Sequence, residues 1–228
     1  MQLMNEQSGF PTPSVTVDVV LFTLEGGHLK VLLPRRSQTP YEGVRALPGG
    51  YVHPQEDEDL AGSARRVLAQ KAGLTAGYFL EQLATFSGLS RDPRGWSVSI
   101  VYYAVVPVGV VPSETLNQFI CVDAVAALPF DHERILAAAL ERLRGKSSYS
   151  SLPAFLLPAR FTFRDLQSVY ESVIGVELDS ASFRRKIEEK GMIAPVEGDM
   201  RRAAGRGRSA QIYSLSEPVL KQYARVLS

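Results

Sequence analysis

The sequence contains little that would stabilise it covalently or hold it in a membrane. Its 228 residues include one cysteine, Cys121, which excludes an internal disulfide and makes a reducing compartment the expectation. No apolar run approaches the ~18 residues of a membrane-spanning helix, and residues 1–13 lack an apolar signal core with a basic flank. We therefore expect a cytoplasmic protein with no membrane partner.

The chain also lacks an overall excess of charge, with 25 Lys and Arg against 24 Asp and Glu. This average conceals an asymmetry, because residues 1–149 have 13 basic against 15 acidic residues and residues 150–228 have 12 against 9. Within residues 180–210 there are eight basic residues and four acidic ones, a local field that attracts a polyanion. A solvated charged surface would explain the charge alone equally well.

The first two thirds of the chain show the apolar patterns of a mixed α/β domain. Strands are predicted at residues 15–24, 29–34, 80–86 and 98–106, and helices at residues 59–72 and from Asp131 to a stop at Gly145. Residues 146–151 are polar and serine-rich, which is typical of a linker. The predicted organisation is a domain over residues 12–145, a linker over 146–160 and a second domain over 161–228.

The second domain has the element order of a DNA-binding module. A capping box that begins at Thr162 starts a helix, Gly175 ends it, and a second helix is predicted over residues 180–190. Two short strand candidates, at 192–196 and 211–215, then flank a stretch rich in arginine and glycine. Helix, tight turn, helix and basic hairpin is the order of a winged helix-turn-helix.

The second helix of this module divides into a core face and a face suited to DNA. Phe183 and Ile187 are four residues apart and are expected in the core, so Arg185 lies at the centre of the opposite face. An arginine there suits a guanine edge, and cations beside it suit phosphates. The predicted DNA-binding residues are Thr162, Ser182, Arg184, Arg185, Lys186, Arg201, Arg202, Arg206 and Arg208. If about five of these cations contact phosphates, log K falls against log salt with a slope near −4 to −5.

A motif in the first domain lacks the acids that it should contain. Residues 47–74 hold a Pro-Gly-Gly turn, an acidic run and a helix that ends at Gly73, and they resemble the Nudix box G-x5-E-x7-R-E-U-x-E-E-x-G-U, where U is bulky and apolar. The box arginine aligns with Arg66, and the glutamates align with Val67, Gln70 and Lys71. Positions i, i+3 and i+4 share a helix face, so the resemblance implies that glutamates there converge on Mg²⁺.

The three substitutions argue against that chemistry. Valine has no ligand atom, glutamine offers a neutral carbonyl, and lysine repels a divalent cation. We therefore expect no metal, no catalytic residue and no enzymatic activity. The alignment also makes the loop two residues longer than the pattern and pairs Glu58 with Arg66 as a structural contact. The acidic run at residues 56–59 is interpreted as favourable charge at a helix N-terminus, with a metal site there as the lesser alternative.

Without metal, a nucleotide would be held by arginines and aromatic side chains. Arg35 and Arg36 end the second predicted strand and can fork onto phosphate. Arg94 is suited to a pyrophosphate, and Tyr51 or Trp96 to stacking on a base. These five residues are the predicted effector site. The competing interpretation is that Trp96 belongs to the core and Arg94 is a solvated loop residue.

Both halves together resemble the Nudix-related transcriptional regulators of bacterial NAD metabolism, the NrtR type. The segments that carry the resemblance are residues 47–52, 58–60, 91–95, 99–103, 156–158, 161–162 and 183–186. The resemblance implies a Nudix α/β/α sandwich followed by a winged helix-turn-helix. It also implies a homodimeric repressor that binds a palindromic double-stranded DNA operator and responds to ADP-ribose or a related nucleotide. Some relatives regulate sugar catabolism instead, which the sequence leaves open.

Two other functions remain open at this point. The first is an active pyrophosphohydrolase of ADP-ribose-like nucleotides that takes metal ligands from Glu56, Asp57 or Glu58. The second is an adaptor whose small helical module docks a partner protein and has a basic loop. The sequence does not reveal the operator, the target genes, the direction of the effector's action or the dimer interface.

Overall fold

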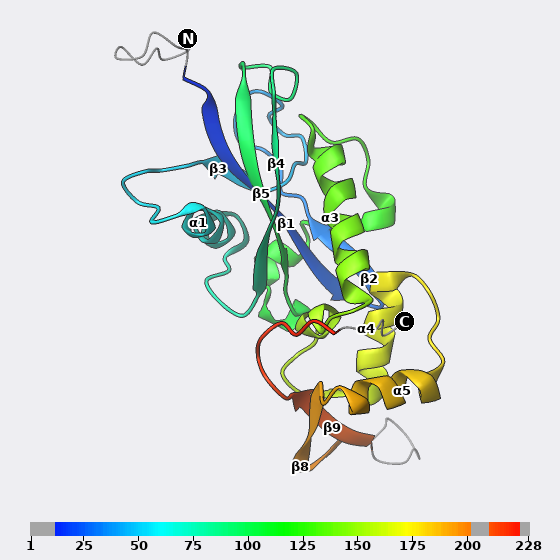
Figure 1. Ribbon diagram of the computed structural model, residues 1–228. Coiled ribbons are helices and arrows are strands. Elements are labelled where there is room, and N and C mark those ends of the chain that lie inside the picture. The colour runs from blue at the N-terminus through cyan, green and yellow to red at the C-terminus, as the bar shows by residue number, and fades with distance from the viewer. Residues whose placement is uncertain (1–11, 202–209, 224–228) are drawn as a thin grey trace. The chain divides into compact units, whose positions relative to one another are not determined.

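The structure, a computed structural model, describes residues 12–201 and 210–223, without the side chains of residues 198–201 (Figure 1). These residues form two compact units. The first contains residues up to Phe22, 30–105 and 110–140, and the second contains residues 23–29, 106–109 and the chain from Glu141 onwards. None of the helices in the described ranges combines the length and apolar character needed to cross a membrane.

A mixed sheet forms the centre of the first unit. Its strands are β1 (Ser14–Glu25), β2 (His28–Leu32), β3 (Gly49–Tyr51), β4 (Phe79–Gly88), β5 (Ser97–Val105) and β6 (Phe119–Cys121). The order is β4-β5-β1-β2-β6, with β3 paired to β1. β1 runs parallel to β5, whereas β1 and β3, β2 and β6, and β4 and β5 pair antiparallel. The hairpin between β1 and β2 turns at Gly26 and Gly27, which both have positive φ.

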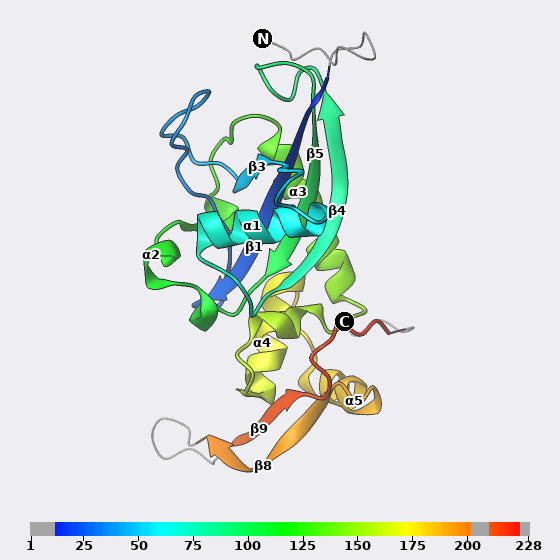
Figure 2. The ribbon, with the colours of Figure 1, turned by 90° about the vertical axis from the view of Figure 1, so that its left-hand side faces the viewer.

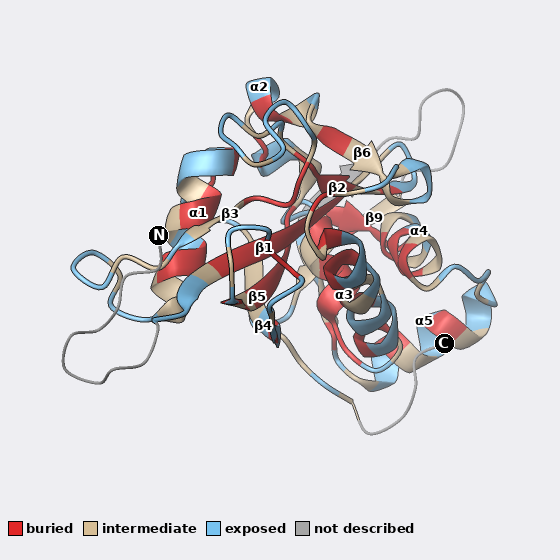
Figure 3. Cartoon of the chain, turned by 90° about the horizontal axis from the view of Figure 1, so that it is seen from above, coloured by how far each residue is buried: buried red, intermediate tan, exposed pale blue. Residues whose placement is uncertain are grey.

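Two helices cover opposite faces of this sheet, α1 (Leu60–Ala72) and α3 (His132–Ser147) (Figures 1 and 2). Short elements complete the chain between them: η1 (Val108–Val110), α2 (Ser113–Leu116) and η2 (Val122–Ala124). Because both faces of the sheet are covered, β1 is buried along most of its length, as its red colour in Figure 3 shows. The expected α/β/α layers are therefore present, and residues 17–23 of β1 are buried in succession between them.

Some of the capping residues and glycines in the sequence mark the ends of helices, and others do not. α1 begins after Asp59, whose carboxylate accepts a hydrogen bond from the Gly62 backbone N–H, and it ends at Gly73 with a φ of 67°. α3 continues to Ser147, so the predicted stop at Gly145 is wrong. Gly145 keeps a negative φ, and the helix continues through Lys146 and Ser147, which are both buried. A glycine ends a helix only where the chain turns left-handed.

The second unit is a winged helix. Its elements are η3 (Leu152–Leu156), β7 (Phe161–Thr162), α4 (Phe163–Ile174), α5 (Ser180–Glu189), β8 (Ile193–Arg201) and β9 (Ala210–Leu215). The strands form a sheet in the order β7-β9-β8. The capping box at Thr162 and Asp165 is present, and Gly175 ends α4 with a φ of 82°. Phe161, Phe163, Leu166, Tyr170, Phe183, Ile187 and Met192 are core residues of this unit.

Most of residues 146–156 are buried, unlike an exposed linker, whereas Tyr149 and residues 158–160 are exposed. Ser147, Ser150 and Ser151 are at most 2% exposed, and η3 buries Leu152 and Leu156. The serines are buried with their hydroxyls satisfied: Ser147 donates to Leu143 O and Ser150 to Lys146 O, each at 2.6 Å. The polar character of these serines therefore does not mean that they are exposed, because a buried hydroxyl is tolerated once it is hydrogen-bonded. The exact domain boundary remains a prediction.

Candidate functional site

A cavity of about 320 Å³ opens in the first unit. Its lining comes from β1, the segment after β2, the Pro-Gly-Gly turn with β3, one face of α1, the loop at residues 91–94, and the residues that lead into α3. Of the residues predicted to bind an effector, Arg35, Arg36, Tyr51 and Arg94 line it. Trp96 is 43% exposed and is not part of the lining, so the structure does not bring it together with the other four.

The helix of the motif presents its substituted positions to this cavity. Val67, Gln70 and Lys71 all line it. Val67 is 2% exposed, whereas Gln70 and Lys71 are exposed. Magnesium requires a near-octahedral set of oxygen ligands that includes carboxylates or phosphates, and these three side chains offer one neutral oxygen and one positive charge. The residues present do not fit a magnesium ion.

The acidic run does not supply a substitute set of ligands. Arg66 binds Asp57 with both nitrogens of its fork, at 2.7 Å each, and not Glu58 as the alignment predicted. Asp57 also accepts hydrogen bonds from Ser63 Oγ at 2.6 Å and from the His53 backbone N–H at 2.8 Å. In the described part of the chain, no three or more His, Cys, Asp or Glu side chains are grouped so as to hold a metal ion.

The position of Asp57 follows from a turn that a linear alignment does not register. The backbone N–H groups of Glu56 and Asp57 both donate to His53 O, which turns the chain and directs the Asp57 carboxylate toward α1. The hydrogen bonds from Arg66 hold the pKa of Asp57 well below its ordinary value. Asp57 is therefore an anion that is paired with Arg66, whereas Glu58 is exposed.

Two arginines and one phenylalanine form a cluster in the cavity. The Arg36 guanidinium lies 4.8 Å from the centre of the Phe130 ring, and the Arg94 guanidinium lies 5.9 Å from the same ring and 5.6 Å from that of Tyr51. Arg94 is held by both oxygens of Asp92, at 3.0 and 2.7 Å. Arg36 donates only to backbone carbonyls, those of Pro40 and Gln38.

The two positive charges of the cluster favour binding of an anion. Burial lowers the pKa of Arg36, and the positive charge of Arg94 lowers it further. Both guanidinium groups remain charged at neutral pH, because arginine does not deprotonate in proteins. A negative group bound between them would relieve their repulsion, and the partial burial of the site would strengthen that attraction relative to water.

Four further residues that line the cavity were not predicted from the sequence to belong to the effector site: Asp18, Arg91, Phe130 and His132. Phe130 has a φ of 60°, uncommon for a residue other than glycine, and its ring also meets that of Tyr41 edge-on at 4.9 Å. A phenylalanine in a loop gives no sequence signal of its own. The positive φ that turns its ring toward two arginines appears only in the folded chain.

The other three residues form the cavity's buried floor. Asp18 accepts a 2.6 Å hydrogen bond from Ser99 Oγ, and Arg91 binds Asp131 at 3.1 and 3.2 Å with Asp18 3.6 Å away. His132 Nδ1 accepts a hydrogen bond from the Leu47 N–H at 3.0 Å, and its Nε2 lies 3.8 Å from Asp18. Burial lowers the pKa of His132, so its ring is neutral, with the proton on Nε2.

In the second unit, α5 has the faces that its sequence predicts. Phe183 and Ile187 are buried at 1% and 0% exposure, whereas the Arg185 side chain is 68% exposed. Arg185 is 3.5 Å from Glu189, an exposed i,i+4 pair of the kind that contributes little and separates readily. Arg184 is more constrained, because its guanidinium stacks 4.0 Å above the Phe163 ring and also approaches Glu188.

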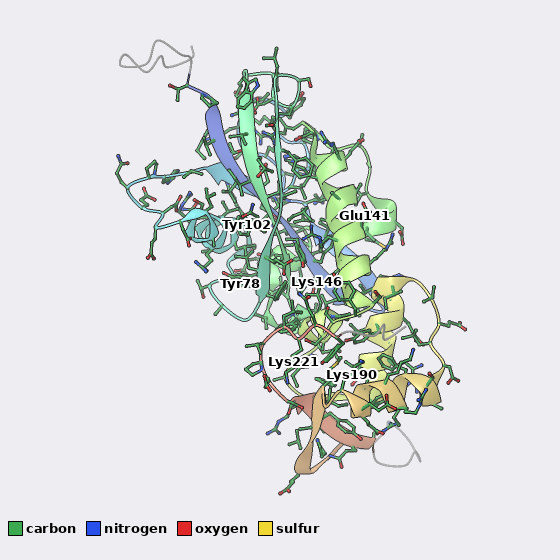
Figure 4. All side chains as sticks on the ribbon, viewed as in Figure 1. Tyr78, Tyr102, Glu141, Lys146, Lys190 and Lys221 are labelled. Carbon is green, nitrogen blue, oxygen red and sulfur yellow. The ribbon has the colours of Figure 1, made fainter. Side chains whose placement is uncertain are left out.

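The remaining predicted DNA-binding residues have mixed positions. Ser182 and Lys186 lie on α5 and are partly buried. Lys190, which is labelled in Figure 4 and was not among the predicted residues, follows the helix and stands over the Tyr223 ring. Thr162 is 8% exposed, and its hydroxyl caps α4 by accepting the Asp165 N–H. Arg201 ends β8, but its side chain is not described, and the predicted residues Arg202, Arg206 and Arg208 lie outside the described residues.

Known families match both units of the chain. The model of the NUDIX domain matches residues 12–142, and the model of the NrtR DNA-binding winged helix domain matches residues 153–215. A relative from Acinetobacter baylyi, named ADPR responsive transcriptional repressor NtrR, is 37% identical over 218 residues, which cover 91% of this chain and 84% of the relative. The chain belongs to the NrtR family.

Solved structures of an NrtR protein extend this assignment to the fold. The NrtR of Shewanella oneidensis, complexed with a 27mer DNA, is 34% identical with a TM-score of 0.84, and the match covers 94% of this chain and 99% of that one. Its NUDIX domain, complexed with ADP ribose, is 35% identical with a TM-score of 0.53, over 61% of this chain and 94% of that one. The predicted Nudix sandwich followed by a winged helix-turn-helix is therefore confirmed.

Proposed function

We propose that this NrtR-family chain is a transcriptional repressor whose Nudix domain senses ADP-ribose without hydrolysing it. The observation that carries the proposal is the set of side chains that α1 presents to the cavity. Val67, Gln70 and Lys71 stand where metal-binding carboxylates would be required, while Arg36, Arg94 and Tyr51 supply an anion site with an aromatic ring beside it. A cavity of this composition suits recognition of a nucleotide diphosphate.

The winged helix supplies the output of this sensor. The Arg185 side chain is 68% exposed, compared with 45% for Arg184, and it occupies the centre of the face opposite the core residues Phe183 and Ile187. The relatives that have been solved with a 27mer DNA or with ADP ribose support the same division of labour. We infer that the chain acts in the cytoplasm as a homodimer on a palindromic double-stranded operator, controlling genes of NAD metabolism.

Control of DNA by the effector is a matter of differential affinity. ADP-ribose must bind one arrangement of the repressor more tightly than the other, and a tenfold change in operator affinity requires about 1.4 kcal/mol of coupling. The coupling is reciprocal, so bound operator must then weaken ADP-ribose binding by the same factor. We propose that ADP-ribose releases the operator.

Operator binding should depend strongly on Arg185. We expect the full-length protein to bind DNA from upstream of its own gene cluster and to lose it when ADP-ribose is added. Arg185→Ala should weaken operator binding by about tenfold to a hundredfold, the range for losing one base contact. Fluorescence anisotropy with labelled operator, repeated over a salt series, measures both this loss and the slope of log K.

The matched control for this variant is Arg65→Ala. Arg65 is an exposed arginine on α1, it does not line the cavity, and its removal changes the net charge equally. Operator binding should be unchanged in Arg65→Ala. An equal loss in both variants would mean that the contact is a general charge effect, and no DNA binding at low salt would reject the repressor function in favour of a protein-docking adaptor.

Hydrolysis of the effector should not occur. With ADP-ribose and Mg²⁺, micromolar protein is expected to release no AMP over hours, because α1 offers no carboxylate to the cavity and Asp57 is held by Arg66. Quantifying AMP by chromatography measures this directly. AMP release that requires Mg²⁺ and disappears in a Glu58→Ala variant would instead support the alternative of a pyrophosphohydrolase with atypical ligands.

A further inference from the structure

Lys71 occupies an unusual position in the cavity. It lies in the last turn of α1, it is exposed, and it shares the cavity lining with Val67 and Gln70. Among the described residues, no hydrogen bond or ion pair engages its ammonium group. The favourable interaction of a cation with the helix C-terminus explains why a lysine is tolerated there. It does not explain why the lysine faces the cavity.

The charges around the cavity do not balance. The cationic side chains of its lining are Arg35, Arg36, Arg66, Lys71, Arg91 and Arg94, and the carboxylates are Asp18 and Asp92. Three of the cations already have acidic partners: Arg66 with Asp57, Arg91 with Asp131 and Arg94 with Asp92. Arg35 and Arg36 donate to backbone carbonyls, which carry no net charge. The cavity therefore has excess positive charge on two sides, on α1 and on the segment after β2.

A diphosphate diester has two negative charges close together, which matches this arrangement. In a metal-dependent site, carboxylates would hold a divalent cation, and that cation would neutralise the diphosphate. Here α1 carries no carboxylate, and the ammonium group of Lys71 stands at one of the helix positions where the metal-binding carboxylates would be. Lysine binds phosphate as a compact point charge on a flexible stem, so it can reach an oxygen without a rigid ligand geometry.

We propose that Lys71 takes the electrostatic role that a divalent cation has in a metal-dependent site and binds the diphosphate of the effector directly. This inference rests on the proposed sensing of ADP-ribose. It has a consequence that the proposed function alone does not have: binding of ADP-ribose is independent of Mg²⁺, and it becomes dependent on Mg²⁺ when acids are returned to the helix. Arg36 and Arg94 then hold the diphosphate from the other side.

The test is isothermal titration of the full-length protein with ADP-ribose, once in EDTA and once in millimolar Mg²⁺. The wild-type Kd should be the same in both buffers. Lys71→Met, which keeps most of the unbranched side chain but removes its charge, should raise the Kd by about tenfold in both, the effect of losing one charge-assisted hydrogen bond. Lys71→Arg should stay within about threefold of wild type, and Arg65→Met, on the same helix outside the cavity, should not change the Kd.

A double variant reverses the metal requirement. Gln70→Glu with Lys71→Glu places two carboxylates at exposed positions of the cavity, so ADP-ribose should bind weakly in EDTA and recover when Mg²⁺ is added. Equal Kd values for wild type and Lys71→Met, or loss of wild-type binding in EDTA, would overturn the proposed role of Lys71 and leave the proposed function standing. A wild-type protein that binds no ADP-ribose in either buffer would overturn the proposed function as well.

Discussion

Replacing Gly49 with alanine should cost about 3 kcal/mol of the free energy of unfolding, near the upper end of the usual range for overpacking. A Cβ at this position would overlap the Asp18 carboxylate and lie 3.1 Å from the Val17 backbone oxygen. Asp18 belongs to the buried floor of the cavity and is 7% exposed, so it cannot move aside without breaking its hydrogen bond with Ser99. Urea denaturation followed by tryptophan fluorescence measures the loss.

The adjacent glycine provides the control. A Cβ at Gly50 would have Val67 Cγ2 as its nearest neighbour, at 3.7 Å, which is ordinary van der Waals contact. Neither glycine requires a positive φ, so the two substitutions differ only in the space available. Gly50→Ala should therefore change the free energy of unfolding by less than about 1 kcal/mol. If both variants were equally stable, the close approach of β3 to the Asp18 carboxylate would be wrong.

Removal of the Arg91 charge should have an effect at least as large. Arg91 is 7% exposed, and it binds Asp131 with two hydrogen bonds, Ser97 with one, and approaches Asp18 at 3.6 Å. Arg91→Met would leave the buried Asp18 carboxylate and the partly buried Asp131 carboxylate without their cation. Breaking a buried ion pair in this way costs about 3–5 kcal/mol, more than the pair itself contributes, because an uncompensated charge remains.

Two further variants separate this explanation from a simple loss of packing. In Arg91→Met combined with Asp131→Asn, one of the stranded charges is removed, so about 1–2 kcal/mol should be recovered relative to the single variant. Arg94→Met is the milder counterpart. The Arg94 side chain is 43% exposed, and its 7% exposed partner Asp92 would keep the hydrogen bond from the backbone N–H of residue 94, so the cost should be about 1–3 kcal/mol, less than for Arg91→Met. Recovery of nothing in the double variant would contradict the electrostatic account.

Arg91 and Arg94 have different roles in the candidate site. Arg91 is enclosed and serves the architecture of the floor, whereas Arg94 is held by Asp92 beside Tyr51 and Phe130 with its charge still facing the cavity. Both come from the same short loop between β4 and β5. The loop sequence alone suggested Arg94 and Trp96 as the functional pair, but Trp96 is not in the cavity lining and Phe130, 36 residues beyond Arg94, takes the aromatic position.

What the sequence could predict about this protein follows from local physics. The capping box at Thr162, the left-handed glycines that end α1 and α4, and the apolar stripes of the helices each depend on a few neighbouring residues, so the element order and both domains were predicted. The identity of Val67, Gln70 and Lys71 is also a property of the sequence, and with it the expectation that this helix does not hold a catalytic metal ion.

Only the tertiary structure decided which side chains meet. Asp18, Arg91 and His132 come from β1, a loop and the first turn of α3, and no periodicity connects residues so far apart in the chain. The partner of Arg66 shifted from Glu58 to Asp57 because a hydrogen-bonded turn rotates the acidic run, and the serines before η3 became buried because backbone carbonyls accept their hydroxyls. Long-range packing and the satisfaction of buried polar groups made these choices, and both depend on neighbours that the linear sequence does not identify.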